Sequence, residues 1–457
     1  MQKQLFRQYD IRGKIGTEIA IDDFYYLTHA ILAFFMEKGC SAIVVGMDGR
    51  THSFPIFQQI LAACKDAGID VHFLGVCSTP VTVFAQYYLP VQGSLMITAS
   101  HNAGDYNGLK IYNHHVAVAG ENLQQIYELF LNKVIIRSDK MSHFFDATGM
   151  VDTYLDSLMM EFDHLKNFSL PVYIDCGNGT GGPLVRRLIE KMSWQHVQIL
   201  CEEVDGTYPH HIADPTDIEN VQDLLAAVEQ HPGSFGIGLD GDCDRLAVVT
   251  RIKKLVTADQ LLTLFAQSIQ AKIIVADIKS SSVLQHAGAQ VVLAKTGCAN
   301  IKTVMAAHSA LIGGELSGHF FFKDRHLGYD DGIYGMLRFF EILYRQSLNC
   351  DELIGSLPEL FTSKDMRIPC SDLVKFDIVE MIKLTLMQDT QFVINDIDGV
   401  RFESQDGWGL IRASNTQPAL SVCCQASSAQ GLQGMKKLLI SLLKNYIDPL
   451  LLEKYIV

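Results

Sequence analysis

The sequence predicts an α/β protein of several domains, in which three similar α/β domains in tandem precede a smaller α+β domain. The chain has 457 residues, which is more than a single hydrophobic core usually organises. One unit occurs three times: an apolar strand, an acidic residue, a turn of small residues and then a helix. The C-terminal residues carry a hairpin pattern instead, which indicates a domain of another kind.

The first domain begins with residues 6–13, which alternate aromatic, charged and apolar side chains. They predict either a short strand or a solvated arm, and Arg7 and Arg12 within them would suit an anion. The elements expected next are a helix at 22–38, a strand at 41–47, a helix at 53–67 and a strand at 70–74. Because the strand at 41–47 is almost continuously apolar, we expect a sheet that is covered on both faces.

The same succession recurs twice further along the chain. The strand at 171–177 precedes a helix that begins near Pro183, and the strand at 272–277 precedes a serine run, 280–282, and a helix. The last domain differs, since Asp398-Gly399 is typical of a hairpin turn. Its expected elements are strands at 392–397, 400–402 and 420–424 and a helix at 430–446.

Composition excludes several classes of protein. The net charge of −14 argues against non-specific nucleic-acid binding, although a local cluster of Arg and Lys can still bind an anion. The 11 cysteines form no C-x-x-C pair, which argues against zinc or disulfide frameworks and favours the reducing cytoplasm. The N-terminus has no apolar signal core, and no apolar segment is long enough to span a bilayer. We therefore expect a soluble, cytoplasmic protein.

The first candidate nucleophile is Ser100, at the end of an apolar strand at 95–97. A loop rich in Asn, Gly and Asp follows it and leads to Lys110. Loops at strand ends present reactive groups, but a serine hydroxyl needs a nearby base, metal or cation to act covalently. Taken alone, this stretch is equally consistent with a polar turn.

Asp240, Asp242 and Asp244 alternate in the loop after an apolar strand at 235–239. Carboxylates at alternate positions of an extended loop lie on one side of the backbone and can converge on one cation. An all-oxygen set suits Mg²⁺ where phosphate is handled, whereas a calcium EF-hand would need Gly where Arg245 stands. A surface turn is the alternative, but the three acids would then repel one another unless Arg245 neutralised them.

Glu315, Ser317 and His319 alternate in a glycine-rich loop. The set suits hydrogen bonds to neighbouring sugar hydroxyls, and His319 could also relay a proton. A structural polar turn is the alternative.

Arg412 is followed closely by Ser414, Asn415 and Thr416. A guanidinium, short hydroxyl and amide side chains and backbone N–H groups in one turn suit a phosphate dianion. The alternative is a capping turn before an ordinary strand.

Residues 177–182 match the G-x-G-x-x-G pattern between a strand and a helix, with Glu202 and Glu203 about twenty residues further on. This pattern alone supports an NAD-dependent dehydrogenase. However, Asp175 would place a charge near the pyrophosphate, and the other polar loops would have no role. We therefore interpret these glycines as structural and keep the dehydrogenase as an alternative.

Together, the loops resemble the α-D-phosphohexomutase family, and most closely its bacterial phosphomannomutase/phosphoglucomutase branch. The matching stretches are YDIRG at 9–13, TASHN at 98–102, DYNGLK at 105–110, DGDCDR at 240–245, GELSGH at 314–319 and RASNT at 412–416. The resemblance implies four domains with mixed α/β sheets in the first three, arranged around a central cleft. We place these domains at 1–148, 149–252, 253–365 and 366–457.

The resemblance also implies a role for each matching residue. Ser100 would carry a phosphoryl group, one oxygen of which completes a Mg²⁺ site made by Asp240, Asp242 and Asp244. The other catalytic residues implied are Arg12, His101, Lys110, Arg245 and His319. The substrate-binding residues implied are Tyr9, Lys279, Glu315, Ser317, Arg412, Ser414, Asn415 and Thr416.

Two positions depart from the family pattern. Ala103 follows Asn102 where the family usually has proline, which removes a rigid backbone angle. Cys298 stands where the branch usually has histidine, and cysteine is a poor donor to a sugar hydroxyl.

The activity that the resemblance implies is a hexose-phosphate mutase for mannose, glucose or both. Phosphoserine would donate to the free hydroxyl of a hexose monophosphate, and the resulting 1,6-bisphosphate would turn over and return its other phosphate. A phosphoglucosamine mutase and a non-catalytic sugar-phosphate-binding protein are alternatives. The expected partners are small hexose phosphates, without nucleic acid or membrane, and the expected state is a monomer or weak dimer.

Overall fold

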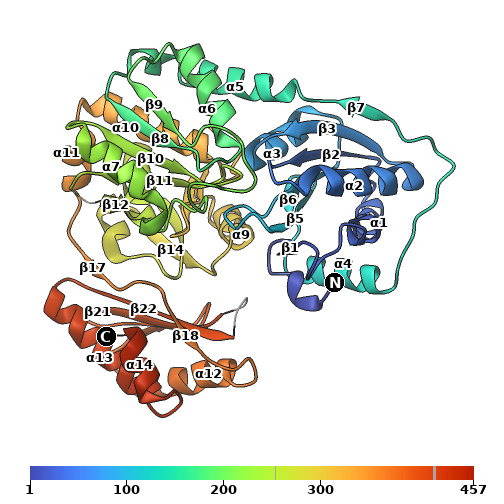
Figure 1. Ribbon diagram of the computed structural model, residues 1–457. Coiled ribbons are helices and arrows are strands. Elements are labelled where there is room, and N and C mark those ends of the chain that lie inside the picture. The colour runs from blue at the N-terminus through green and yellow to red at the C-terminus, as the bar shows by residue number, and fades with distance from the viewer. Residues whose placement is uncertain (253, 415–417, 457) are drawn as a thin grey trace.

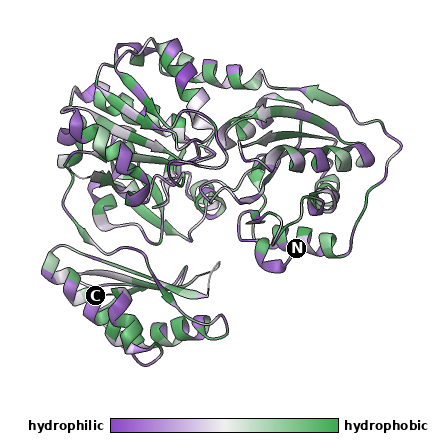
Figure 2. Ribbon diagram, in the orientation of Figure 1, coloured by the Kyte–Doolittle hydropathy of each residue, from purple (hydrophilic) through white to green (hydrophobic). Residues whose placement is uncertain are grey.

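We describe the protein from a computed structural model, which describes residues 1–252, 254–414 and 418–456. Figure 1 shows four bodies in chain order, of which the second and third pack closely together and the fourth lies below them. Hydrophobic residues concentrate in the strands, and the loops between the strands are largely hydrophilic (Figure 2). Among the described residues, no helix combines the length and the apolar character needed to cross a membrane.

The first body is a mixed sheet whose strand order is β1-β5-β4-β2-β3-β7, with β6 paired to β5. The strands are β1 (Ile11–Lys14), β2 (Ala42–Met47), β3 (Asp70–Val76), β4 (Gly93–Ile97), β5 (Tyr106–Asn113), β6 (Val116–Ala117) and β7 (Phe144–Asp146). The helices are η1 (Lys3–Leu5), α1 (Asp23–Met36), α2 (Ser53–Ala67), α3 (Thr79–Tyr88) and α4 (Glu121–Leu131). Val45 belongs to the apolar cluster that α1 and α2 join, whereas Val44 belongs to the cluster that α3 joins. Alternate side chains of β2 therefore lie on opposite faces, and both faces are covered.

The second body has the strand order β12-β11-β10-β8-β9, in which β10, β8 and β9 are parallel and the others antiparallel. Its strands are β8 (Val172–Asp175), β9 (Val197–Leu200), β10 (Phe235–Leu239), β11 (Leu246–Thr250) and β12 (Lys254–Val256). Its helices are α5 (Met150–Glu161), η2 (Asp163–Asn167), α6 (Gly181–Met192), η3 (Ile218–Val221) and α7 (Gln222–Gln230). The repeated strand–turn–helix unit therefore folds as expected.

The third body has the strand order β14-β13-β15-β16, with only the last pair antiparallel. Its strands are β13 (Ile273–Asp277), β14 (Gln290–Ala294), β15 (Ile312–Gly314) and β16 (Phe320–Phe322). Its helices are α8 (Ala258–Ser268), η4 (Ser282–Ala287), α9 (Cys298–His308), α10 (Gly332–Gln346) and α11 (Cys350–Gly355). The helix expected after the serine run is present as a short 3₁₀ helix, which Ser281 caps and Gly288, at φ 70°, ends.

The fourth body is an antiparallel sheet with helices packed on it. The sheet order is β17-β22-β21-β20-β19, with β18 also paired to β22. Its strands are β17 (Phe361–Thr362), β18 (Met366–Pro369), β19 (Val393–Asn395), β20 (Val400–Glu403), β21 (Gly407–Ala413) and β22 (Ala419–Ala426). Its helices are α12 (Lys375–Leu386), α13 (Ala429–Leu443) and α14 (Pro449–Ile456). The turn predicted at Asp398-Gly399 does connect β19 to β20.

These sheets place the predicted loops at strand ends. Ser100 follows β4, Asp240 follows β10, and Glu315 follows β15, while Arg412 lies near the end of β21. Loops at strand ends escape the core while the strands fix their backbones, which is the usual setting for a binding site. The fold class predicted from the sequence is confirmed.

Candidate active site

The loop that carries Ser100 is held by one buried arginine. The Arg50 guanidinium donates to the carbonyl oxygens of Ser100, Asn102 and Ala103 at 2.8, 2.6 and 2.5 Å. Its Nε also pairs with Asp48 at 3.0 Å. Ser100 itself has φ 49°, a left-handed conformation that persists only where the surroundings hold the backbone. Sequence reasoning missed Arg50, although it follows the acidic turn at the end of the first apolar strand.

The Ser100 hydroxyl faces an acid and an imidazole. Its Oγ donates to Oδ2 of Asp240 at 2.8 Å and lies 3.2 Å from Nδ1 of His101. Burial and the charges of Arg245 and Arg12 lower the pKa of His101 well below its ordinary value, so this ring is neutral near pH 7. A neutral imidazole and a carboxylate beside a hydroxyl can each take its proton.

The structure brings Asp240, Asp242 and Asp244 together, with one carboxylate oxygen of each within 4.8 Å of the others. Oδ1 of Asp242 and Oδ1 of Asp244 are buried and have no hydrogen-bond partner among the described residues. Buried carboxylate oxygens without a partner are costly, and an all-oxygen set is what a hard divalent cation prefers. The three aspartates therefore fit a metal site.

Lys110, on β5, supplies the nearest positive charge to these acids. Its Nζ contacts Oδ2 of Asp242 at 2.5 Å and also Oδ2 of Asp244. Burial would raise the pKa of Asp242, but the Lys110 charge and hydrogen bonds from Lys110 and Thr79 outweigh it, and the pKa is lowered. For Asp240, burial and the charges of Asp244 and Asp242 raise the pKa well above its ordinary value. A cation bound among these acids would relieve their mutual repulsion.

Arg245 connects the acidic loop, Asp240–Asp244, to the loop predicted to bind sugar, Glu315–His319. Its Nε lies 3.6 Å from Oδ2 of Asp240 and donates to Nε2 of His319 at 3.2 Å. Because a guanidinium only donates, Nε2 of His319 presents a lone pair to it. On the other side of the ring, Nδ1 faces Oδ2 of Asp330 at 3.2 Å.

Glu315, Ser317 and His319 line one cavity of about 250 Å³, which Ser100 and Lys110 also line. The predicted sugar loop and the predicted nucleophile therefore face the same space. Glu315 is 4% exposed, and burial raises its pKa. This cavity is where a small polar ligand would meet the serine.

Cys298, one of the two departures from the family pattern, lies in this cavity too. Its Sγ donates to Oε2 of Glu315 at 3.3 Å, and the backbone N–H of Gly297 donates to Oε1 at 2.5 Å. Burial raises the pKa of the Cys298 thiol well above its ordinary value, so the thiol stays protonated. A Cβ at Gly297 would lie 1.8 Å from the Tyr9 ring, so glycine is what lets Tyr9 pack against this turn.

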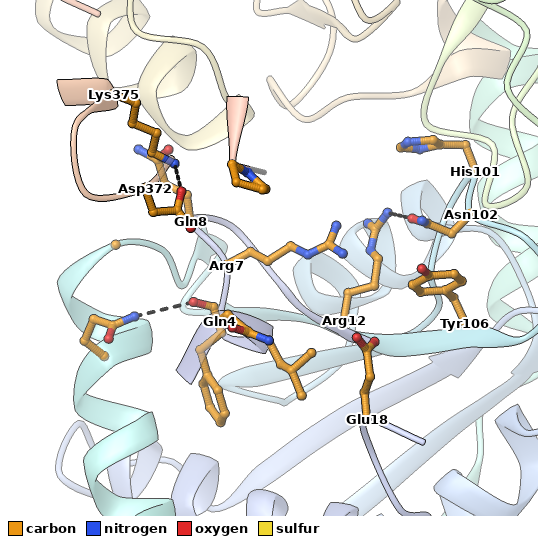
Figure 3. Close-up of a pocket in the computed structure, with 15 residues that line it drawn as sticks. Gln4, Arg7, Gln8, Arg12, Glu18, His101, Asn102, Tyr106, Asp372 and Lys375 are labelled. Carbon is orange, nitrogen blue, oxygen red and sulfur yellow. Dashed lines mark hydrogen bonds and ion pairs between the residues drawn. The ribbon is translucent and has the colours of Figure 1, made fainter. Parts of the chain in front are cut away.

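Arg7 and Arg12 line a wider cavity of about 900 Å³ between the N-terminal segment and the fourth body (Figure 3). Arg12 donates to Asn102 at 2.6 Å and to Asp10 at 2.5 Å, while its buried Nε has no partner among the described residues. The Arg7 guanidinium points toward that of Arg12 (Figure 3). Burial and the charge of Arg12 lower the pKa of Arg7. Two adjacent guanidiniums, of which Arg12 has an unused Nε, favour an anion, so Arg7 joins the candidates.

The remaining predicted residues lie in different places and do not all line the small cavity. Arg412 is buried, with Nη2 3.3 Å from Asp398 and Nη1 donating to Thr296 at 3.2 Å. Ser414 is buried beside it in sequence, whereas Asn415 and Thr416 lie outside the described residues. Lys279 lines a separate cavity of about 570 Å³, which His101, Arg245 and Ser317 also border.

Asp330 was missed by sequence reasoning. It lines the small cavity, faces His319, and pairs with Nζ of Lys302 at 2.9 Å. Burial would raise the pKa of Asp330, but Lys302 and His319 outweigh it, and the pKa lies well below its ordinary value. It belongs to no motif with a recognisable spacing, so no local pattern could have found it.

The glycine motif at 177–182 is packed against the acidic loop. The Thr180 N–H donates to the carbonyl oxygen of Gly241 at 2.9 Å. A Cβ at Gly179 would lie 2.6 Å from that same oxygen. The Thr180 N–H is therefore already engaged in a hydrogen bond. The Gly241 backbone also fills the space in which a dinucleotide would place its pyrophosphate.

Comparisons with known proteins identify the family of this chain. Models of the phosphoglucomutase/phosphomannomutase family match four consecutive parts of the chain: α/β/α domain I at residues 3–134, domain II at 152–253, domain III at 257–361 and the C-terminal domain at 367–440. The phosphomannomutase/phosphoglucomutase of Pseudomonas aeruginosa (strain PAO1) is 34% identical over 456 residues, 96% of this chain and 95% of that protein. A phosphoglucomutase of Neisseria gonorrhoeae is 34% identical over 442 residues, 94% of this chain and 95% of that protein.

Among solved structures, a phosphoglucomutase/phosphomannomutase family protein from Burkholderia thailandensis superposes with a TM-score of 0.87 at 29% identity, covering 97% of this chain and 98% of that one. The fold and the serine–aspartate site thus define an enzyme of the phosphohexomutase class. Within that class, the chain belongs to the phosphoglucomutase/phosphomannomutase family. The family predicted from the sequence is confirmed.

Proposed function

We propose that this chain catalyses reversible phosphoryl transfer between the 1- and 6-positions of a hexose phosphate, with mannose, glucose or both as the sugar. The observation that carries the proposal is the Ser100 hydroxyl, which is 1% exposed and 2.8 Å from Asp240 in a cavity shared with the sugar loop. The names of the relatives agree, since they are phosphomannomutases and phosphoglucomutases.

In the first half-reaction, phosphorylated Ser100 donates its phosphoryl group to the free hydroxyl of a hexose monophosphate. The bond from phosphorus to Oγ breaks, a bond to the sugar oxygen forms, and the sugar hydroxyl proton passes to Nε2 of His319. The proton that Oγ needs comes from the Lys110 ammonium, which lines the same cavity as Ser100 and contacts Asp242. Lys110 and Arg245 place positive charge beside the transferring group, which is what phosphoryl transfer requires of a protein.

Asp240, Asp242 and Asp244, with one oxygen of the phosphoserine, would hold Mg²⁺, and the ion would neutralise charge on the transferring group. The orphaned oxygens of Asp242 and Asp244 support this assignment.

In the second half-reaction, the hexose 1,6-bisphosphate turns over and returns its other phosphate to Ser100. Both ends of this intermediate carry the same group, so one phosphate grip serves both orientations. Arg412, Ser414, Asn415 and Thr416 provide that grip, and Arg7 and Arg12 offer further cations in the wide cavity that they line. Glu315 and Ser317 bind sugar hydroxyls, and Tyr9 and Lys279 approach the substrate. Added bisphosphate would also prime unphosphorylated enzyme, acting as an activator.

Replacement of Ser100 tests the proposal. We expect Ser100→Ala to abolish conversion of mannose 1-phosphate and glucose 1-phosphate, and the wild-type protein to carry a phosphate on Ser100 by mass spectrometry. Ser157→Ala, a serine on α5 remote from the site, is the control and should keep full activity. Normal turnover by the Ser100 variant would refute the mechanism. Glucosamine 1-phosphate, assayed in parallel, distinguishes the proposed activity from that of a phosphoglucosamine mutase, which would prefer this substrate.

We further propose that the enzyme works in the cytoplasm as a monomer or weak dimer, with hexose phosphates as its partners and neither nucleic acid nor membrane. Its 11 cysteines are all free, which suits a reducing compartment, and its net charge is −14. Light scattering over a concentration series would measure the oligomeric state.

A further inference from the structure

A second cluster of chemically versatile side chains lies in the second body, outside the active site. β8 and β9 are neighbouring parallel strands, so Asp175 at the end of β8 and Cys201 just after β9 lie at the same edge of the sheet. His211, from the loop that follows, completes the cluster, and the three ligand atoms lie within 4.8 Å of one another. We propose that Asp175, Cys201 and His211 form a binding site for Zn²⁺ or a similar transition-metal ion.

The spacing of the ligand atoms suits a tetrahedral ion. Nε2 of His211 lies 3.0 Å from Oδ2 of Asp175 and 3.8 Å from Sγ of Cys201. Zinc–ligand bonds of about 2.0–2.3 Å put neighbouring ligand atoms of a tetrahedron roughly 3.3–3.6 Å apart. The observed separations lie on either side of that range, so shifts of a few tenths of an ångström would form the site.

Groups around the cluster already orient the ligands. Nδ1 of His211 lies 3.0 Å from the carbonyl oxygen of Ile212, which can only accept, so Nδ1 donates there and Nε2 is directed at the cluster. Oδ1 of Asp175 accepts from the N–H of Gly177 at 2.9 Å, which leaves Oδ2 for the ion. A backbone carbonyl behind a histidine and a donor behind a carboxylate are the usual supports of metal ligands.

The donor set selects the type of metal. One sulfur, one nitrogen and one oxygen suit zinc, whereas the all-oxygen trio of the active site suits magnesium. Cys201 and His211 are both partly exposed, so an ion can enter and a water molecule can fill the fourth position. Without metal, His211 and Asp175 form an ion pair, in which a proton on Nε2 occupies the place of the ion.

The segment between Cys201 and His211 reaches the catalytic serine loop. Gly206 packs so closely on Arg50 that a Cβ there would lie 2.3 Å from the Arg50 Cα, and its carbonyl oxygen would lie 2.7 Å from a Cβ at Gly104. An ion at the cluster would tie the two ends of this segment together. The proposal concerns binding and does not depend on the mutase activity.

Cobalt titration of the tag-free, metal-stripped full-length protein tests the site. We expect a near-ultraviolet charge-transfer band from the thiolate to cobalt. The band should reach its full intensity when one Co²⁺ ion is bound to the thiolate of each protein chain, and it should disappear when Zn²⁺ displaces the cobalt. Cys201→Ser and His211→Gln should lose the band, because each removes a ligand. Cys298→Ser is the matched control, since Cys298 lies in a different cluster, with Glu315 and His319, and it should keep the band.

Titration calorimetry with Zn²⁺ measures the affinity of the site for the ion in the wild-type protein and in each variant. Loss of an outer-shell partner commonly weakens metal binding about 10–100-fold, so loss of the Cys201 or His211 ligand should weaken the sulfur-containing site by at least that much. The absence of a thiolate band in wild-type protein, or its survival in Cys201→Ser, would overturn the proposal. If a variant fails to fold, alkylation of the wild-type protein decides: Zn²⁺ but not Mg²⁺ should protect Cys201 from iodoacetamide, and equal labelling would reject the site.

Discussion

At the scale of single residues, His319 shows how neighbours define a chemical role. Arg245 donates to Nε2, so that nitrogen presents a lone pair, while Asp330 faces Nδ1. Burial alone would lower the pKa of His319, but Asp244 and the hydrogen bond to Asp330 outweigh it, and the pKa is raised. In the proposed mechanism, a sugar hydroxyl would take the place of Arg245 at Nε2, and the ring would act as a base with increased affinity for the proton.

The pH dependence of turnover follows from that raised pKa. The ring must be neutral to take a proton, and a raised pKa keeps it protonated to higher pH. We therefore expect kcat/KM to rise with pH through an apparent pKa above the ordinary imidazole value of about 6.5. His319→Gln should lower kcat about 10²-fold or more and remove this limb of the profile. An unchanged profile in the variant would exclude His319 as the base.

Arg7 provides a second test at this scale. Its guanidinium borders the wide cavity beside Arg12, where an anionic ligand would relieve the repulsion between them (Figure 3). A hydrogen bond to a charged group contributes about 1.5–3 kcal/mol, so Arg7→Gln should lower kcat/KM about ten-fold or more, mainly through KM. Arg137→Gln, which replaces an exposed arginine paired with Asp66, is the control. Equal KM values in the two variants would remove Arg7 from the substrate site.

At the scale of elements, the acidic loop depends on the glycine loop packed against it. Gly179 and Thr180 lie against the backbone of Gly241, within the Asp240–Asp244 turn. Sequence reasoning identified both loops but could not see that they touch, because about sixty residues separate them and each pattern is local. In this chain, glycines of the G-x-G-x-x-G pattern therefore allow two backbone segments to pack closely.

Gly179→Ala tests this packing. The new Cβ would meet the Gly241 carbonyl oxygen at 2.6 Å, so the acidic loop has to move. We expect kcat to fall and the Mg²⁺ concentration for half-maximal activity to rise, with no NAD binding by wild-type or variant in calorimetry. Gly434→Ala, where nothing lies within 4 Å, is the matched control. Heat from NAD binding to the wild-type protein would revive the dehydrogenase alternative.

At the scale of the whole molecule, the first three bodies share a core and the fourth is attached more lightly. One apolar cluster contains Val44 of the first body, Phe235 of the second and Phe340 of the third. The fourth body has its own core and meets the third through a small cluster of Ile278 with Trp408 and its neighbours. This arrangement favours movement of the fourth body relative to the others, as expected of a domain that closes over a substrate.

Arg401 is one of the polar links between the third and fourth bodies. Its Nη1 donates to the carbonyl oxygens of Ile278 and Ser280, at 2.7 Å each, and its guanidinium stacks on Trp408 with 4.0 Å to the ring centroid. Arg401→Ala should raise KM several-fold, because the Arg412 loop would no longer be held in position relative to the cavity. The first three bodies should keep their thermal unfolding midpoint in scanning calorimetry. Lys437→Ala, on the exposed side of α13, is the control. An unchanged KM would show that the link does not position the phosphate grip.

The sequence by itself determined the fold class, the family and the loops that meet at the site, because strand periodicity, turn residues and motif spacing are properties of short stretches. It also pointed to Ser100, the three aspartates and the predicted sugar loop as candidates. Only the tertiary structure decided that Arg50 holds the serine loop, that Asp330 faces His319, that Cys298 holds Glu315, and that Asp175, Cys201 and His211 converge. Each of these depends on contacts between segments far apart in the chain, which side-chain packing and burial determine and local pattern does not encode.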